Sequence, residues 1–242
     1  MPAPLIWTEP FRVRAYEVGP GDTASPLAIV DYFQEAAGEH AEALGVETFD
    51  LGGSVGAWVM TRMAVEFERL PRWRDAVTVE TWPSGRDGLR ATRDLLLLDR
   101  DGNRLARART VWLVVDLTRR RPVRLPPAVL AIDPPDREAS VVLGAPPAAP
   151  EQVESARTVT VRRSDLDRND HANNARFVEW ALDAADRDPA GLRALDVSFI
   201  GEARLGDTLR SVAAAESEDT LAHAILRDGA RRPLATLRTR WS

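Results

Sequence analysis

An internal repeat constrains the fold of this chain more than any other feature. The segments LARARTVW (105–112) and LATLRTRW (234–241) share five of eight residues, and each follows an Asp-Gly pair of the kind that joins hairpin strands. Further upstream, RWRDAVTVE (72–80) parallels RLGDTLRSV (204–212), with an arginine and then an aspartate before an alternating strand. Because these segments recur in the same order, we predict two copies of one unit.

Each copy is predicted to contain one long helix and an antiparallel sheet, which is an α+β architecture. In the first copy, Ser25 and Pro26 suit the start of a helix and Gly45 suits its end. Its apolar face is formed by Ile29, Phe33, Ala37, His40, Ala41 and Leu44. The strands of this copy are expected at 11–18, 58–68, 76–82, 89–99 and 105–116.

The second copy repeats this plan. A helix is expected from about Asn174, with Phe177, Ala181 and Ala184 in a stripe. Its strands are expected at 158–163, 194–202, 208–215, 220–227 and 234–241. Residues 124–152 contain seven prolines, which predicts an ordered but irregular linker. The predicted domains are therefore 1–125 and 153–242, with the linker at 126–152.

Composition excludes several classes of function. With 242 residues, 44% of them hydrophobic, the chain can bury real cores, but no apolar run approaches the ~20 residues of a membrane span. The start of the sequence has no secretion signal, and the absence of cysteine excludes disulfides and a thiol nucleophile, which favours a cytoplasmic protein. The absence of lysine excludes Schiff-base chemistry, and a net charge of −5 argues against general nucleic-acid binding.

Polar side chains are concentrated in SDLDRNDHANN (164–174). If the backbone is extended there, Asp167, Asn169 and His171 point the same way and form a row beside the start of the next helix, whose N–H groups could hold an oxyanion. The same residues also suit a turn in which Asn173 or Asn174 caps the helix. Spacing alone leaves the catalytic and the structural interpretations equally open.

Two other kinds of site have less support. The remaining histidines are His40 and His223, and the spacing of a structural metal site is absent around the polar segment. A serine triad would need a Gly-x-Ser-x-Gly turn, which the sequence does not contain. We expect both histidines to be structural, because one falls on the apolar face of a helix and the other within a strand.

SDLDRNDHANNARFVEWALD resembles the signature of the fatty acyl-ACP thioesterases of plants and bacteria, D-L-D-x-N-x-H-x-N-N-x-x-[YF]-x-x-W. VRAYEVGPGDTAS, YFQEAAGEHAEALG and WVMTRMAVEFERLPRWRDAVTVETWPSG resemble the first half of the same family, so that the resemblance covers nearly the whole chain. It implies a double hotdog fold, in which each unit is a long helix wrapped by an antiparallel sheet. The repeat predicts the same plan.

The resemblance implies catalytic roles for Asp167, Asn169, His171 and Glu202. The family's Glu-Cys pair falls on Glu202 and Ala203, so a cysteine nucleophile is absent. In the implied reaction, Glu202 activates a water that attacks a thioester, Asn169 and His171 position the water or polarise the carbonyl, and Asp167 orients one of them by hydrogen bonding. Whether Asp167 or Glu202 is the base stays open. No metal or cofactor is implied.

Other residues are weaker candidates for substrate binding. The first copy reads GPGDTASPL where the second has its polar row, so we expect it to be non-catalytic, and the resemblance implies that it houses the acyl chain. Trp58, Met60 and Met63 could line that pocket, although core packing explains them equally well. Asn173 and Asn174 are further candidates beside the predicted catalytic residues.

The expected function is hydrolysis of fatty acyl-ACP to free fatty acid and holo-ACP. The basic run Arg119, Arg120 and Arg121, with Arg124, could dock the acidic acyl carrier protein, or it could be a solvated edge. The alternatives are an acyl-CoA thioesterase with the same site, a non-catalytic sensor of acyl thioesters, and a hydratase or dehydratase. Chain-length preference stays open, as does the choice between a monomer and a homodimer.

Overall fold

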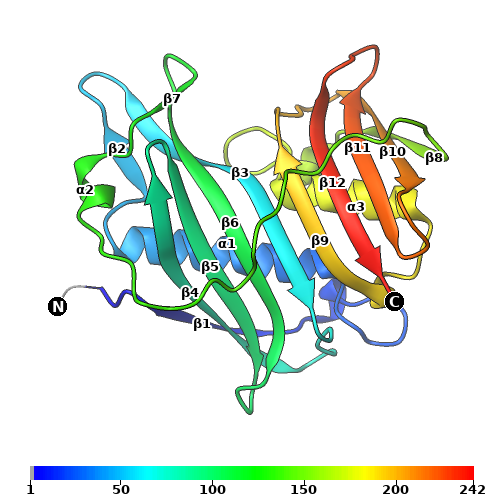
Figure 1. Cartoon of the computed structure of the whole chain (residues 1–242), viewed down its shortest axis with the longest axis horizontal. Helices are drawn as coiled ribbons and strands as arrows, with labels where there is room; N and C mark the ends of the chain where they lie inside the picture. Colours follow the sequence, from blue (N-terminus) through cyan, green and yellow to red (C-terminus); the bar gives the residue numbers. More distant parts are fainter. Residues whose placement is uncertain (1–2) are drawn as a thin grey trace. The chain divides into compact units, whose positions relative to one another are not determined.

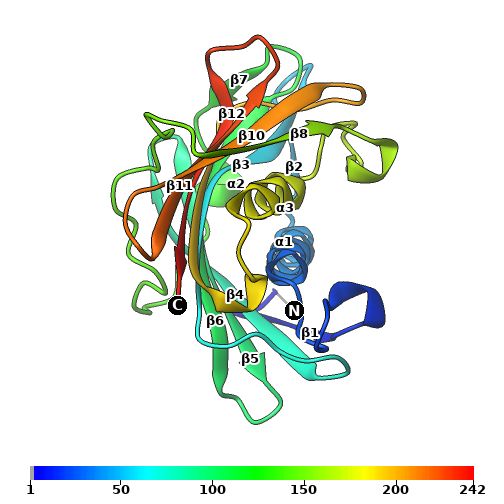
Figure 2. The same cartoon turned by 90° about the vertical axis from the view of Figure 1, so that its right-hand side faces the viewer.

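The computed structural model describes residues 3–242, which form two compact units. The first takes in the chain as far as Ala24 together with Ala28–Val142, and the second comprises Ser25–Leu27 and Leu143–Ser242. In each unit, one long helix lies on one face of an antiparallel sheet (Figures 1 and 2). The predicted α+β plan is therefore confirmed for each unit. Within residues 3–242, no helix has both the length and the apolar character needed to cross a membrane.

The sheet of the first unit has the order β1-β4-β5-β6-β3, and all its neighbouring strands are antiparallel. Two short strands extend it, β2 against β3 and β7 against β6. The strands are β1 Trp7–Arg12, β2 Thr48–Asp50, β3 Val55–Phe67, β4 Ala76–Asp87, β5 Arg90–Asp99, β6 Arg104–Asp116 and β7 Arg121–Val123. The expected strands at 58–68, 76–82, 89–99 and 105–116 correspond to β3, β4, β5 and β6. The prediction missed β2 and β7, which are only three residues long.

Helix α1, Pro26–Ala43, begins at the proline that was predicted to start it. It ends in a Schellman motif, in which Gly45 adopts φ +69° and its N–H donates to Glu42 O, while the N–H of Val46 donates to Ala41 O. Except for Leu44, which is half-buried, the residues of the predicted apolar stripe are buried. This burial, more than helix propensity, holds α1 in place.

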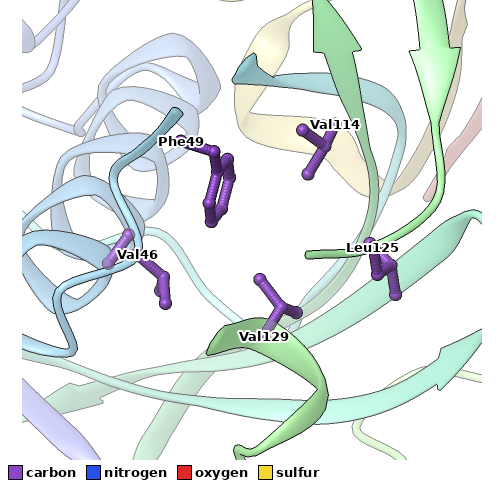
Figure 3. Packing of buried hydrophobic residues seen from close by; sticks show 6 residues of the cluster. Val46, Phe49, Val114, Leu125 and Val129 are labelled. Carbon is purple, nitrogen blue, oxygen red and sulfur yellow. The ribbon is translucent and has the colours of Figure 1, made fainter. Parts of the chain in front are cut away.

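A small hydrophobic cluster in the first unit brings together residues from several elements (Figure 3). Its members are Ala41, Val46, Phe49, Val114, Leu125 and Val129. Val129 belongs to α2, Pro127–Leu130, within the segment predicted to be an irregular linker. That prediction is wrong for these four residues, because Pro127 favours a first helical turn and Val129 gains burial in the cluster. Residues 131–154 contain no helix or strand.

The sheet of the second unit has the order β9-β12-β11-β10-β8, again with antiparallel neighbours. Its strands are β8 Ser155–Thr160, β9 Leu192–Phe199, β10 Thr208–Ala215, β11 Thr220–Arg227 and β12 Pro233–Trp241. Helix α3, Asn174–Ala185, contacts β8, β10 and β11. The predicted stripe on α3 is buried, together with Ala175, Val178 and Trp180.

The expected first strand of each copy was placed too late in the sequence. The strands end at Arg12 and Thr160, and the chain then forms short 3₁₀ helices at Ala15–Glu17 and Arg163–Asp165. Each is closed by a capping box, because an acidic side chain three residues on accepts the N–H of Arg14 or Arg162 at 2.7 Å. The strand expected at 194–202 also ends earlier, at Phe199, so that Glu202 lies in the following loop.

Candidate active site

The predicted catalytic residues before α3 lie in a tight turn and not in an extended row. The N–H of Asp167 donates to His171 O at 2.8 Å, and the N–H of Asp170 donates to Asp167 O at 3.2 Å. Asp170 adopts φ +62°, a left-handed conformation that aspartate tolerates better than most residues. The backbone is therefore not extended as the row requires, and the alternative of a turn is correct, because aspartate and asparagine stabilise a turn at this spacing.

The carboxylate of Asp167 holds this turn together. Its Oδ1 accepts the N–H of Asn169 at 2.7 Å and lies 3.5 Å from the N–H of His171. Asp167 thus acts on both residues through their main chain. Asn169 is exposed in the turn, whereas His171 is half-buried.

Asn173 is the N-cap of α3, and Asn174 is the first helical residue. The side-chain Oδ1 of Asn173 accepts the N–H of Ala175 at 2.8 Å, and its main-chain O accepts the N–H of Arg176 at 2.9 Å. Two of the first three helical N–H groups are therefore occupied. The N–H groups at this helix start were expected to bind an oxyanion. The N–H groups of Ala175 and Arg176 do not fit this expectation, because they already bond to Asn173.

Glu202 reaches this turn from the loop between β9 and β10. The N–H of Ala172 donates to Ala203 O at 2.8 Å, which joins the two segments. Beside this bond, His171 Nε2 lies 3.1 Å from Glu202 Oε2. The side chains of His171 and Glu202 are 25% and 43% exposed, so water has access to the pair. Arg204 places an Nη2 at 3.5 Å from the same carboxylate oxygen.

Two further residues hold the loop of Glu202, and sequence reasoning missed both. Arg227 donates to Glu202 O at 3.0 Å and to Asp207 Oδ2 at 2.9 Å. Burial alone would raise the pKa of the Asp207 carboxyl, but hydrogen bonds from Arg227 and from the N–H of Arg204 hold it below its ordinary value. No local motif marks Arg227, because it reaches this loop only through the pairing of β10 with β11, in which it lies opposite Leu209.

The first unit forms the same turn without the same side chains. The N–H of Gly19 donates to Thr23 O at 3.0 Å, and the N–H of Asp22, at φ +59°, donates to Gly19 O at 3.2 Å. The N–H of Ala24 donates to Pro71 O at 2.8 Å, as Ala172 does to Ala203 in the second unit.

This correspondence aligns the two units residue by residue. In the first unit, Gly19 takes the position of Asp167 and Gly21 that of Asn169. Thr23 takes the position of His171, and Leu70 that of Glu202. None of these four side chains can act as a general base, which supports a non-catalytic first unit. The same correspondence supports the predicted duplication.

The other weaker candidates for substrate binding, apart from Asn173 and Asn174, lie in the first unit. Met60 and Met63 are buried, and Trp58 is half-buried against the hydrophobic cluster, where its Nε1 donates to Val46 O at 2.7 Å. The arginines 119–121 are exposed: Arg119 and Arg120 lie in the connection between β6 and β7, and Arg121 begins β7. Arg119 donates to Asp116 Oδ2 at 3.0 Å.

The two other histidines are buried. His40 Nε2 lies 2.9 Å from Pro4 O, and Arg93 donates to His40 Nδ1 at 2.8 Å. His223 Nε2 lies 2.8 Å from Thr239 Oγ1. Burial lowers the pKa of each imidazole to about 4. Within residues 3–242, no three histidine, aspartate or glutamate side chains group closely enough to hold a metal ion.

Comparison with known proteins identifies the family. The model of the acyl-ACP thioesterase N-terminal domain matches residues 4–132, and that of the acyl-ACP thioesterase C-terminal domain matches residues 148–242. A palmitoyl-acyl carrier protein thioesterase of Gossypium hirsutum is 32% identical over 75% of this chain and 47% of its own length. An oleoyl-acyl carrier protein thioesterase of Arabidopsis thaliana is 28% identical over 87% of this chain and 63% of its own.

Solved structures show the same fold. A 12:0-ACP thioesterase from Umbellularia californica matches with a TM-score of 0.85 at 25% identity, over 99% of this chain and 98% of its own. An acyl-ACP thioesterase from Bacteroides thetaiotaomicron matches with a TM-score of 0.87 at 23% identity, over 98% of each chain. These likenesses confirm the expected double hotdog fold. The chain spans about half the length of the first curated relatives that it matches, which are chloroplast proteins. Since the two family models together match nearly all of its residues, this chain belongs to the acyl-ACP thioesterase family.

Proposed function

We propose that this protein hydrolyses fatty acyl-ACP thioesters to free fatty acid and holo-ACP. The observation that carries the proposal is the 3.1 Å contact between His171 Nε2 and Glu202 Oε2, on two segments that belong to the matched C-terminal domain. A water-accessible carboxylate that an imidazole holds in place can act as the general base in hydrolysis. The counterpart positions of the first unit, Thr23 and Leu70, have no such pair.

In the proposed reaction, Glu202 takes a proton from a water whose oxygen attacks the thioester carbonyl carbon. The C–S bond then breaks, and the carrier's sulfur leaves as a thiol after it accepts the proton that Glu202 took from the water, which regenerates the carboxylate. His171 orients the Glu202 carboxylate, and the exposed amide of Asn169 donates to the developing oxyanion. We assign Asp167 the role of stabilising the turn and not the role of the base, because its Oδ1 already accepts main-chain N–H groups.

The choice of carrier protein over coenzyme A rests on the relatives, which are named for acyl carrier protein substrates. The exposed arginines 119–121 offer positive charge to an acidic carrier. The cysteine-free sequence supports the cytoplasm as the compartment of the reaction.

Release of free acid tests the proposal directly. Purified protein is assayed with matched acyl-ACP and acyl-CoA panels, as wild type, Asn169→Ala and Glu202→Gln. The control is Glu216→Gln, since Glu216 is also a surface carboxylate paired with an arginine, at 2.6 Å from Arg238. We expect faster hydrolysis of acyl-ACP, with losses of ~10²-fold or more in the two site variants only.

Each other outcome has a defined meaning. Faster hydrolysis of acyl-CoA than of acyl-ACP would mean that the substrate is an acyl-CoA, cleaved by the same catalytic residues. Binding of thioesters without release of acid would contradict hydrolysis and favour a sensor. An equal loss in Glu216→Gln would contradict the assignment of Glu202.

A further inference from the structure

Glu202 lies on an exposed loop, and a base on a loop needs its main chain held. The loop between Phe199 and Thr208 contains Gly201 and Gly206, and Gly206 adopts φ +83°. Glycine gives the chain freedom that must be removed before a carboxylate can stay in contact with His171. A displacement of about 1 Å at a reacting group can cost ~10²-fold in rate.

The guanidinium of Arg227 provides this restraint from the end of β11. Its Nη2 donates to Glu202 O at 3.0 Å and to Asp207 Oδ2 at 2.9 Å, and its Nε donates to the same Oδ2 at 3.2 Å. Asp207 Oδ2 also accepts the N–H of Arg204 at 2.9 Å. One planar group thus contacts both sides of the loop, at the residue that carries the carboxylate and at the aspartate that closes the turn.

The first unit shows that the loop does not need this arginine in order to fold. There, Asp75 Oδ2 accepts the N–H of Arg72 at 2.8 Å, and Asp75 O accepts the N–H of Val13 at 3.0 Å. The second unit repeats both bonds, from Arg204 to Asp207 Oδ2 and from Val161 to Asp207 O at 2.9 Å.

The strand position that corresponds to Arg227 differs between the units. Arg227 pairs with Leu209, two residues after Asp207, and its counterpart pairs with Val77, two residues after Asp75. That counterpart is Asp99, which forms an ion pair with Arg69 at 2.5 Å. An arginine at this strand position, bonded to both sides of the loop, is therefore present in the unit whose loop carries Glu202. It is absent from the unit whose loop carries Leu70.

We infer that Arg227 is a positioning residue, which fixes the main chain at Glu202 and so holds the Glu202 carboxylate against His171. This inference rests on the proposed function, because Glu202 is taken there as the base. The alternative is a purely structural ion pair, since the first unit joins the same strand position to its own loop through Asp99 and Arg69. The kinetic test below separates the two roles.

The test compares Arg227→Met and Arg227→Lys with Arg238→Met. Arg238 is a matched control, since it donates two hydrogen bonds to the carboxylate of Glu216 in a bidentate contact. Its side chain is 43% exposed, and that of Arg227 is 44% exposed. For acyl-ACP hydrolysis we expect kcat to fall about tenfold or more in Arg227→Met, with KM nearly unchanged. Lysine supplies one donor group and cannot span both oxygens, so we expect partial recovery in Arg227→Lys. Arg238→Met retains wild-type kcat.

A double-mutant cycle separates positioning from general destabilisation. If Arg227 acts through Glu202, adding Arg227→Met to Glu202→Gln lowers the residual rate no further. An equal loss in both backgrounds, or an effect on KM alone, would overturn the inference.

Hydrogen exchange of the main-chain amides tests the restraint by Arg227 independently of whether the protein hydrolyses thioesters. In Arg227→Met, we expect faster exchange across 200–207 and unchanged exchange across the corresponding loop at 68–75. Unchanged exchange at 200–207 would overturn the inference even in an active enzyme. Faster exchange in a protein whose wild type hydrolyses no thioester would support the restraint and contradict the proposed function instead.

Discussion

Buried histidines should make the stability of this protein depend on pH in a defined window. His223 is fully buried in β11, and burial lowers the pKa of its imidazole from 6.5 to about 4. Between these two values the unfolded chain binds more protons than the folded chain. The free energy of unfolding is therefore greatest above pH 6.5 and falls as the pH decreases toward 4. Linkage gives a loss of about 2 kcal/mol at pH 5 relative to pH 8 from this residue alone.

The assay is urea denaturation of wild type and His223→Gln at pH 8 and pH 5. Glutamine can still bond Thr239 Oγ1, but it does not titrate. We expect the loss of stability between the two pH values to be smaller by about 2 kcal/mol in the variant. His40→Gln in the first unit should behave in the same way, since burial also lowers the pKa of His40 to about 4. Equal losses in wild type and in both variants would refute the reasoning.

Three further predictions concern the turn, the helix and the basic run. Asn173→Ala removes the N-cap of α3 and should lower the free energy of unfolding by about 1 kcal/mol, measured by chemical denaturation. Asp167→Ala frees the main chain of the turn and should lower kcat by ~10-fold or more, whereas a loss of stability without a loss of kcat would contradict its assigned role. Replacing the exposed arginines 119–121 by alanine should lower kcat/KM for acyl-ACP most at low salt, and by more than it lowers kcat/KM for acyl-CoA, which stopped-flow measurements over a range of ionic strength would check.

The sequence predicted the regular elements of both units well, for a physical reason. Strands such as β10 and β11 are rich in apolar residues and are flanked by polar connections, and their bounds were predicted without error. Helix α3 was predicted from its stripe and its asparagine cap. Short elements such as β2 and α2 have no periodicity to detect, because their packing and pairing partners lie elsewhere in the chain.

The candidate site could be predicted only in part. The residues of the turn were found, but alternation suggested an extended row, whereas the carboxylate of Asp167 closes a turn onto the N–H of Asn169. Glu202 came from the family resemblance, since its contact with His171 joins distant segments. No sequence pattern indicated that Arg227 belongs to the site, because only the pairing of β10 with β11 brings it to Glu202 O.

The two units together illustrate how one loop geometry carries different chemistry. Gly19 and Asp167 occupy the same position in the same hydrogen-bonded turn, yet only the aspartate adds a side-chain acceptor for the main chain. Leu70 and Glu202 likewise share a loop position. The backbone of the duplicated unit supplies the scaffold, and side chains in the second unit supply the candidate chemistry.

In the proposed mechanism, Glu202, held against His171, activates the water that cleaves the thioester. Single-turnover release of free fatty acid from acyl-ACP by wild type and Glu202→Gln tests it most directly, because chemistry is then separated from product release. We predict that the rate of acid release falls ~10²-fold or more in Glu202→Gln, while the affinity for acyl-ACP changes little. A rate within about twofold of wild type would contradict the claim.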